Sequence, residues 1–243
     1  TVEPAFGLPA RWIQASDKDQ AETQGYTVID APSVLVTHLT EVLKKVAAEL
    51  LSRDDVKALI DNVKETSPAV VDELIPNILN LGHVQSVLAR LLREGVSIRN
   101  LPVILESLAN AANESKDPQV LTEKVRAAIA RTIVDPLLDG TGTLHAATIE
   151  PQLEKALSDA IVGGEGLNAL PQGFLSRFVD GTATALASMA NDGRDPILIT
   201  RSTLRPFLAE AVTSVIPNAI VLSYQETAPA KKVETSSQVT VPA

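Results

Sequence analysis

The stretch from Leu91 to Leu108, LLREGVSIRNLPVILESL, constrains the fold more than any other part of the sequence. It predicts a helix that ends at Gly95, a short link, and a second helix capped by Asn100 with Pro102 in its first turn. Each helix carries apolar residues at helical spacing. Helices joined by so short a link must pack side by side, which predicts the central hairpin of a helical domain.

Further helices are predicted on both sides of this hairpin. A long helix opens at Pro32, and its apolar residues at helical spacing are Leu35, Leu39, Val42, Leu43, Val46 and Leu50. Ser52 and Asp55 form a capping-box pattern for the next helix, Ser67-Pro68 starts another, and Asp117-Pro118 caps the last. We therefore expect a compact helical subdomain over residues 53–131.

The pattern changes after residue 131. A proline and two glycines between Asp135 and Gly142 mark a boundary. Short β-type segments at 144–149, 197–199 and 220–222 then alternate with helical segments, which predicts a small α/β subdomain over 132–225 with crossover connections. The remaining residues, 226–243, are polar and contain prolines, so they are expected to form a flexible tail.

The first 52 residues predict part of another unit. The proline-rich segment around Phe6 permits an edge strand or an irregular crossing, and Tyr26–Ile29 predicts a short strand. A short polar helix that ends at Gly25 lies between them. Two strands and one small helix cannot bury a core. The chain also opens with Thr1, and we expect it to be a fragment whose first subdomains are incomplete. The predicted fold class is α+β and multidomain, with a partial β-containing N-terminal subdomain, a central helical one and a small C-terminal α/β one.

Composition excludes several kinds of function. The net charge of −9 disfavours a nucleic-acid surface, which needs clustered Lys and Arg. Cysteine is absent, so disulfides, thiolate chemistry and cysteine-type zinc sites are excluded. No apolar run is long enough to span a bilayer, and no signal peptide is evident.

Residues that often carry chemistry do not form a catalytic pattern. His38, His83 and His145 are not at metal-ligand spacing, and each is interpreted as a structural histidine. Gly163–Gly166 follows a helix rather than a strand, which favours a helix C-cap and loop over a phosphate cradle. The helix from Pro102 to Asn110 lacks Lys and Arg, which argues against a DNA-recognition helix. We predict no enzymatic activity, no cofactor and no metal.

Phe6 is the strongest candidate for a binding residue on physical grounds alone. Prolines and glycine surround it, so the local segment has little capacity to bury it. Two interpretations stand: Phe6 fills a neighbouring domain, or it is an aromatic anchor at the edge of a groove that binds a partner. A third hypothesis, a small-molecule α/β enzyme within Thr143–Tyr224, requires convergent polar groups at the strand ends, and the sequence shows no such set.

Five separated blocks resemble the FHIPEP family of type III export gate proteins, in its flagellar branch: EPAFGLPARWI, GYTVIDAPSVLVTHL, LLREGVSIRNLPVILESLA, GGEGLNALP and IPNAIVLSYQE. The resemblance implies the cytoplasmic C-terminal region of a protein in the bacterial inner membrane. It also implies a docking platform for flagellar export chaperones with bound substrates, which are handed to the membrane export channel. Other implied partners are a homo-oligomeric ring, the export ATPase complex and the substrate-specificity switch protein, but no nucleic acid.

The resemblance further implies a chaperone-binding dimple. Its acidic, phenylalanine and threonine positions fall on Glu3, Phe6 and Thr37, with Ile29 at a nearby apolar position. The acidic position is usually aspartate in the family, so the longer arm of Glu3 is a departure. The alternative within the family is the same role in a virulence-type injectisome.

Overall fold

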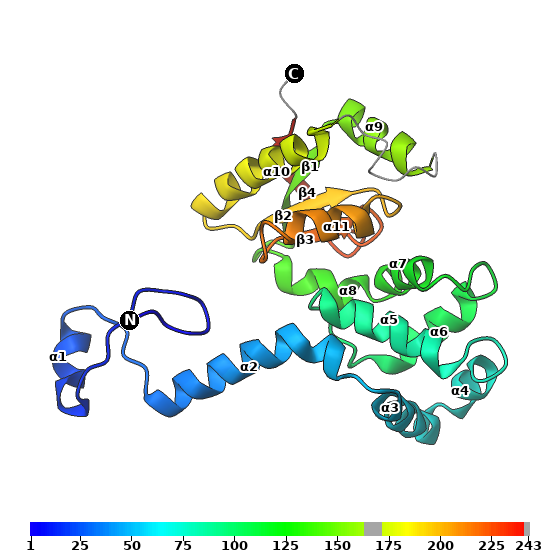
Figure 1. Cartoon of the computed structure of the whole chain (residues 1–243), viewed down its shortest axis with the longest axis horizontal. Coiled ribbons are helices and arrows are strands. Elements are labelled where there is room, and N and C mark those ends of the chain that lie inside the picture. Colours follow the sequence, from blue (N-terminus) through cyan, green and yellow to red (C-terminus); the bar gives the residue numbers. More distant parts are fainter. Residues whose placement is uncertain (163–171, 241–243) are drawn as a thin grey trace.

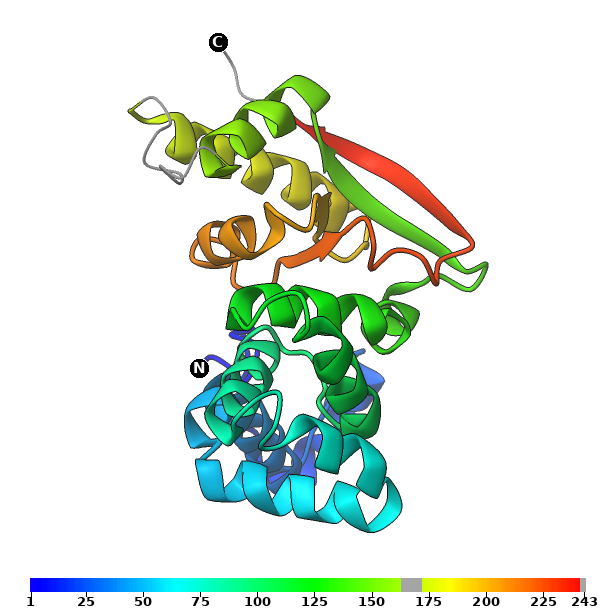
Figure 2. The same cartoon turned by 90° about the vertical axis from the view of Figure 1, so that its right-hand side faces the viewer.

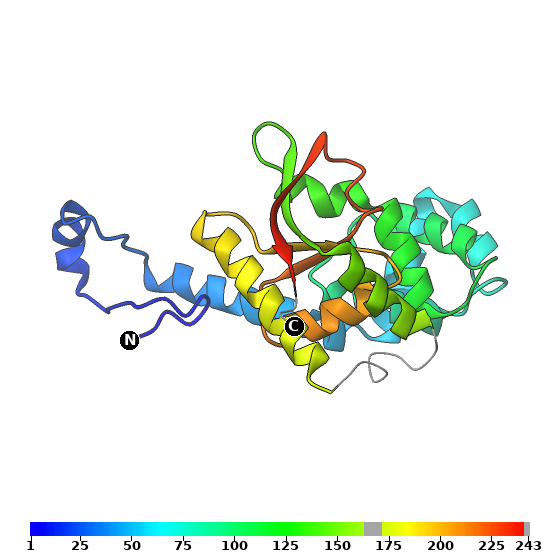
Figure 3. The same cartoon turned by 90° about the horizontal axis from the view of Figure 1, so that it is seen from above.

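The computed structural model describes residues 1–162 and 172–240, and it has three parts (Figure 1). An N-terminal arm, residues 1–50, leads into a helical unit of residues 51–129. A short linker of residues 130–137 then joins the helical unit to an α/β unit of residues 138–240. The helical and α/β units lie against each other, whereas the arm projects away from both (Figures 1 and 3).

The arm contains η1 (Ala15–Asp17), α1 (Lys18–Thr23) and the long helix α2 (Ala31–Leu50). Asp30 caps α2, because its carboxylate accepts the Ser33 N–H at 2.9 Å, and Pro32 lies in the first turn. The C-terminal end of α2 runs into the helical unit, where the Gln85 amide donates to the Leu51 carbonyl at 2.9 Å. The predicted helix from Pro32 is therefore confirmed.

The predicted strand at Tyr26–Ile29 is wrong, and of the two alternatives for the segment around Phe6 the irregular one is found. Within residues 1–50, all of which the structure describes, the only β-type pairing is an isolated antiparallel bridge between Val2 and Pro9. Proline cannot donate to a strand ladder, and this segment has no longer strand beside it. The apolar residues of α2 were expected to face a core, yet no residue of α2 is buried. Val46 is half-buried where the C-terminal half of α2 contacts α5, whereas Leu35, Leu39, Val42 and Leu43 are exposed.

The helical unit packs α3 (Arg53–Thr66), α4 (Pro68–Leu74), α5 (Leu81–Arg93), α6 (Leu101–Ala111) and α7 (Pro118–Ala128) around one core. The predicted capping box of α3 is present: Asp55 N–H donates to the Ser52 hydroxyl at 3.1 Å, and Ser52 N–H donates to the Asp55 carboxylate at 2.9 Å. Asp117 caps α7 as expected, by accepting the Gln119 N–H at 2.7 Å.

The predicted hairpin is formed by α5 and α6. Gly95 follows α5 with a φ of +71°, a conformation that favours glycine, and Val96 N–H donates back to the Leu91 carbonyl at 2.9 Å. Fully buried leucine and isoleucine side chains from both helices meet in the core: Leu88, Leu91, Ile104, Leu105 and Leu108. The prediction that Asn100 caps α6 is wrong, since its side chain makes no capping bond. Asn100 has a ψ of 55°, outside the extended conformation that Asp30 and Ser52 adopt where they cap their helices.

The linker consists of α8 (Ala130–Val134) and η2 (Asp135–Leu137). The α/β unit contains β1 (Thr143–Ile149), α9 (Pro151–Val162), α10 (Phe174–Asn191), β2 (Ile197–Thr200), α11 (Arg205–Thr213), β3 (Ile220–Ser223) and β4 (Lys232–Val239). The strands form a parallel sheet in the order β3-β2-β1-β4 (Figure 2). The mixed α and β fold class is therefore confirmed, with the β-structure confined to the C-terminal unit.

The prediction of a flexible tail over 226–243 is wrong for most of its length. β4 pairs with β1 from Thr143↔Lys232 to Ile149↔Val239, and Val239 is fully buried. A β-carbon on Gly181 of α10 would stand 2.6 Å from the Thr240 carbonyl oxygen, so the chain after β4 lies directly on α10. β4 is an edge strand, and polar residues suit an edge that faces solvent. The polar composition of β4 is therefore similar to that of a disordered tail, which is why the strand was not predicted.

Candidate functional site

A tight turn presents Phe6 to solvent. The two carboxylate oxygens of Glu3 accept the N–H groups of Ala5 at 2.8 Å and Phe6 at 2.7 Å. Backbone bonds from Gly7 N–H to the Glu3 carbonyl at 3.0 Å and from Glu3 N–H to the Leu8 carbonyl at 2.8 Å complete the turn. Gly7 supplies the positive φ of +72° that the turn needs. Phe6 is 64% exposed, which is large for an aromatic side chain.

The other two predicted site residues lie further along the arm. Ile29 immediately precedes the Asp30 cap of α2 and is 57% exposed, whereas Thr37 is half-buried within α2. The structure joins Glu3 and Phe6 in one turn. The hydrogen bonds among the described residues do not connect that turn with Ile29 or Thr37, so a four-residue site stays a prediction.

The arm exposes more apolar surface than the sequence analysis singled out. Trp12 and Tyr26 are each 68% exposed, and Val2 and Leu8 are each 61% exposed. Aromatic residues make up only 3% of the chain, so the presence of Phe6, Trp12 and Tyr26 in one segment could have indicated a binding surface from the sequence. Exposed aromatic and aliphatic side chains gathered on one projecting segment are typical of a surface that binds another protein.

A buried charge cluster lies between the helical and α/β units. Its members are Glu94, Glu123, Arg126, Arg205 and Glu226. Arg126 Nη1 donates to Glu94 Oε2 at 2.7 Å, while Arg205 donates through Nη1 to the same oxygen at 2.6 Å and through Nε to Glu123 Oε2 at 2.6 Å. The Arg126 and Arg205 side chains are 3% and 1% exposed.

This cluster was not predicted from the sequence, although two of its members lie in the sequence blocks quoted above. Glu94 belongs to LLREGVSIRN, and Glu226 ends IVLSYQE. Arg126 also falls in the apolar stripe of α7, next to Val125, and a cation at such a position signals a buried partner. The partners come from segments distant in sequence, so periodicity could not identify them.

Two of the three histidines, His83 and His145, serve local structure. His83 Nδ1 accepts the Asn80 N–H in the capping box of α5. His145 Nε2 lies 2.9 Å from Asp139, whose carboxylate also accepts the Thr141 hydroxyl and the Thr143 N–H. Those bonds, that from Thr141 above all, hold the pKa of Asp139 well below its ordinary value. In residues 1–162 and 172–240, no group of three or more His, Asp or Glu side chains is arranged to hold a metal ion.

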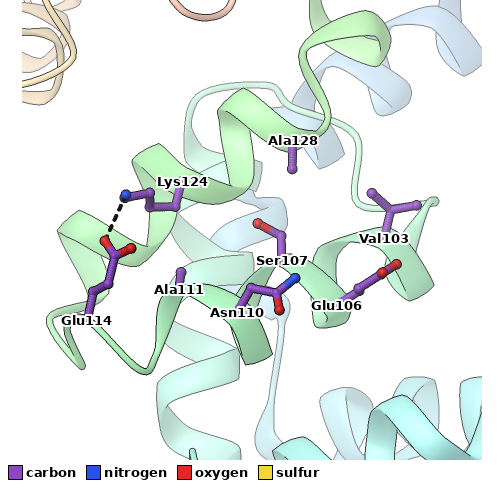
Figure 4. Close-up of a pocket in the computed structure, with 8 residues that line it drawn as sticks. All are labelled: Val103, Glu106, Ser107, Asn110, Ala111, Glu114, Lys124 and Ala128. Atoms are coloured by element: carbon purple, nitrogen blue, oxygen red, sulfur yellow. Dashed lines mark hydrogen bonds and ion pairs between the residues drawn. The ribbon is translucent and has the colours of Figure 1, made fainter.

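A surface groove of about 320 Å³ runs between α6 and α7 (Figure 4). Glu106, Ser107 and Asn110, the polar outer face of the second hairpin helix, line one side. On the other side Lys124 is paired with Glu114 at 2.9 Å. Val103, Ala111 and Ala128 complete the lining, so the groove is mixed in character, with two acidic side chains and one basic one.

The carboxyl ends of the parallel strands are where an α/β enzyme would bind a ligand. The buried carboxylate found there, Glu154, accepts the Thr200 hydroxyl at 2.9 Å and the Arg201 N–H at 3.0 Å. These bonds fasten α9 to the end of β2, which gives Glu154 a structural role. The predicted loop at Gly163–Gly166 lies outside the described residues.

The fold is that of the cytosolic domains of type III secretion proteins. The Chlamydia pneumoniae CdsV structure superposes with a TM-score of 0.83 at 24% identity, covering 97% of this chain and 68% of that chain. The nonameric SctV-C structure from EPEC has a TM-score of 0.78 at 22% identity, covering 93% and 68%. At such identities the similarity concerns the fold.

Sequence comparison then gives the family. The chain belongs to the FHIPEP family, whose model matches residues 1–232. It is 39% identical to the flagellar biosynthesis protein FlhA of Bacillus subtilis, covering 93% of this chain and 34% of that protein. It is 38% identical to FlhA of Escherichia coli K12, covering 93% and 32%. The chain thus spans about a third of the length of these relatives. None of the described helices is long and apolar enough to cross a membrane.

Proposed function

We propose that this chain is a non-enzymatic docking platform of the flagellar type III export gate, which receives export chaperones with their bound substrates. The observation that carries the proposal is the projecting arm, where the turn closed by Glu3 holds Phe6 64% exposed. An exposed aromatic on a fixed turn loses little conformational freedom when a partner covers it, so it can act as an anchor. Glu3 sets the turn, and Ile29 and Thr37 extend the proposed site toward α2.

The flagellar branch is favoured over an injectisome by sequence identity. The relatives at 32–39% identity are flagellar biosynthesis proteins, whereas the CdsV and MxiA structures and the EscV cytosolic domain from the type III secretion system share 22–24%. Both branches have the same fold, so fold similarity does not separate them. Tighter binding of a flagellar chaperone than of an effector chaperone would directly favour the flagellar branch over the injectisome.

Assembly and location belong to the same proposal. Solved cytosolic domains of the same fold are described as nonameric, and CdsV was solved in complex with CdsO. We infer that the longer protein forms a ring at the cytoplasmic face of the inner membrane. There it would contact other components of the export apparatus, including the ATPase complex and the substrate-specificity switch protein.

Calorimetric titration with a purified flagellar chaperone–substrate complex tests the proposal. Phe6→Ala is expected to weaken binding by about 2 kcal/mol, the scale of an interface hot spot, with an unchanged circular dichroism spectrum. Val215→Ala is the control, because Val215 is an apolar residue of the α/β unit that is 58% exposed and lies outside the arm. Unchanged affinity for Phe6→Ala, or equal losses for both variants, would contradict an anchor at Phe6.

A further inference from the structure

The contact between the helical and α/β units is polar at its centre. Glu94 ends α5, and Glu123 and Arg126 project from α7, all in the helical unit. Arg205 begins α11, and Glu226 follows β3, both in the α/β unit. Arg205 and Glu226 are 1% and 0% exposed, whereas the Glu94 side chain is 28% exposed, so the cluster is buried at its arginines and reaches the surface at Glu94.

Glu94 is the centre of the cluster. Its carboxylate accepts bonds from Arg126 at 2.7 Å and from Arg205 at 2.6 and 3.1 Å. Arg205 bonds in addition to both oxygens of Glu123. Arg126 Nη2 also lies 2.6 Å from Glu226 Oε1, without the alignment of a hydrogen bond, so that contact is an electrostatic one. Each arginine therefore joins carboxylates from different elements. The contacts that cross between the units are Arg126–Glu226, Arg205–Glu94 and Arg205–Glu123.

The apolar cores, in contrast, remain separate. The helical core draws on residues from α3 to α7, and the two cores of the α/β unit draw on its sheet and helices. Among the described residues, Ile133 alone packs against both the helical core and a core of the α/β unit. Ile133 belongs to α8, and the chain passes between the units only once, through this linker.

These two observations have a mechanical consequence. Apolar contacts are non-directional, whereas a buried network of hydrogen-bonded charges is favourable only in one geometry. If the units separate, water can solvate the released charges, and neither apolar core is opened. Elements joined in this way form rigid bodies that turn about the terminal residues of a linker.

We propose that the Glu94–Arg126–Arg205 network, with Glu123 and Glu226, is an interdomain latch. It holds the α/β unit in one orientation on the helical unit, and its release lets the two turn about α8 and η2 without unfolding. The latch involves residues outside the arm and does not depend on the proposed docking function.

Distance measurement between spin labels tests the latch. The chain has no cysteine, so labels can be placed at Glu65→Cys in α3 and Asp192→Cys at the end of α10, both exposed positions. The parent chain should give one narrow distance distribution. Arg205→Met, which keeps the length of the side chain without its charge, is expected to broaden the distribution by about twofold or more. The helical circular dichroism signal should be retained.

Arg201→Met is the matched control. Arg201 lies in the same unit, and its 53% exposed guanidinium pairs with Glu154 away from the cluster, so its distribution should stay narrow. Glu94→Gln is a second variant that preserves shape at the other side of the latch. Unchanged distributions in both latch variants would overturn the proposal. It would also be overturned if both variants lost helical signal, because the cluster would then support folding of the units rather than their orientation.

Discussion

Glu94 and Arg205 lie 111 residues apart in the chain, and two hydrogen bonds of 2.6 and 3.1 Å join them. The same carboxylate also accepts a bond from Arg126, so one side chain at the end of α5 balances two buried guanidinium groups. Burial alone would lower the pKa of Arg205, but hydrogen bonds to Glu123 and the charges of both glutamates raise it above its ordinary value. Arg205 therefore keeps its charge, and a buried guanidinium depends on its carboxylate partners.

Removal of the Glu94 charge should destabilise the folded chain. Glu94→Gln is expected to reduce the free energy of unfolding by about 2 kcal/mol, the scale of hydrogen bonds to charged groups, because both arginines lose a charged partner that is itself partly exposed. Urea denaturation followed by circular dichroism measures the loss. Glu106→Gln removes an exposed carboxylate from α6 and should have little effect. Coincident unfolding curves for the two variants would show that the cluster contributes no net stability.

Glu3 should act through the backbone of the Phe6 turn. Glu3→Ala removes the acceptor of two N–H groups, and hydrogen exchange at Ala5 and Phe6 should accelerate about fivefold, equivalent to about 1 kcal/mol. Amide exchange followed by NMR gives the rates directly. Glu22→Ala, an exposed change in α1 of the same arm, should leave them as they were. If the parent amides already exchange at the rate of an unstructured peptide, the turn is not held by Glu3.

The capping box of α3 should contribute measurably to the helical unit. Ser52→Ala removes the side-chain acceptor of the Asp55 N–H and is expected to cost about 1 kcal/mol in thermal unfolding. Ser67 offers a matched control, because it occupies the N-cap position of α4 without a side-chain capping bond. Ser67→Ala should therefore be nearly neutral. An equal loss in the two variants would mean that the effect is not one of capping.

Asp139 should give the end of the sheet a pH dependence. Its pKa is depressed in the folded chain, chiefly by the Thr141 hydroxyl, then by the Thr143 N–H and His145. A depressed carboxyl pKa stabilises the folded state above the unfolded value of about 3.9, and the contribution is lost as pH falls toward the folded value. Asp139→Asn should thus lower the melting temperature at pH 7 but not once pH is well below 3. A difference that persists unchanged into acid would contradict this assignment.

Local signals in the sequence were sufficient for much of the fold. Ser52 and Asp55, Asp117-Pro118 and Gly95 lie where helices begin and end, because caps and positive φ angles depend on neighbouring residues alone. The segments that became β1, β2 and β3 were recognisable because they are short, apolar and flanked by turns. The family followed from blocks that the comparison confirmed over residues 1–232.

Tertiary structure decided what depends on distant partners. β4 is polar because it lies at an edge, and only its pairing with β1 makes it a strand. Phe6 was a candidate from its surroundings in sequence, but its exposure and the role of Glu3 in its turn are seen only in the three-dimensional structure. The charge cluster was unpredictable for the same reason: its attraction exists only after folding brings together segments that are far apart in the chain. Sequence determined where the elements lie, and long-range pairing determined how the units join.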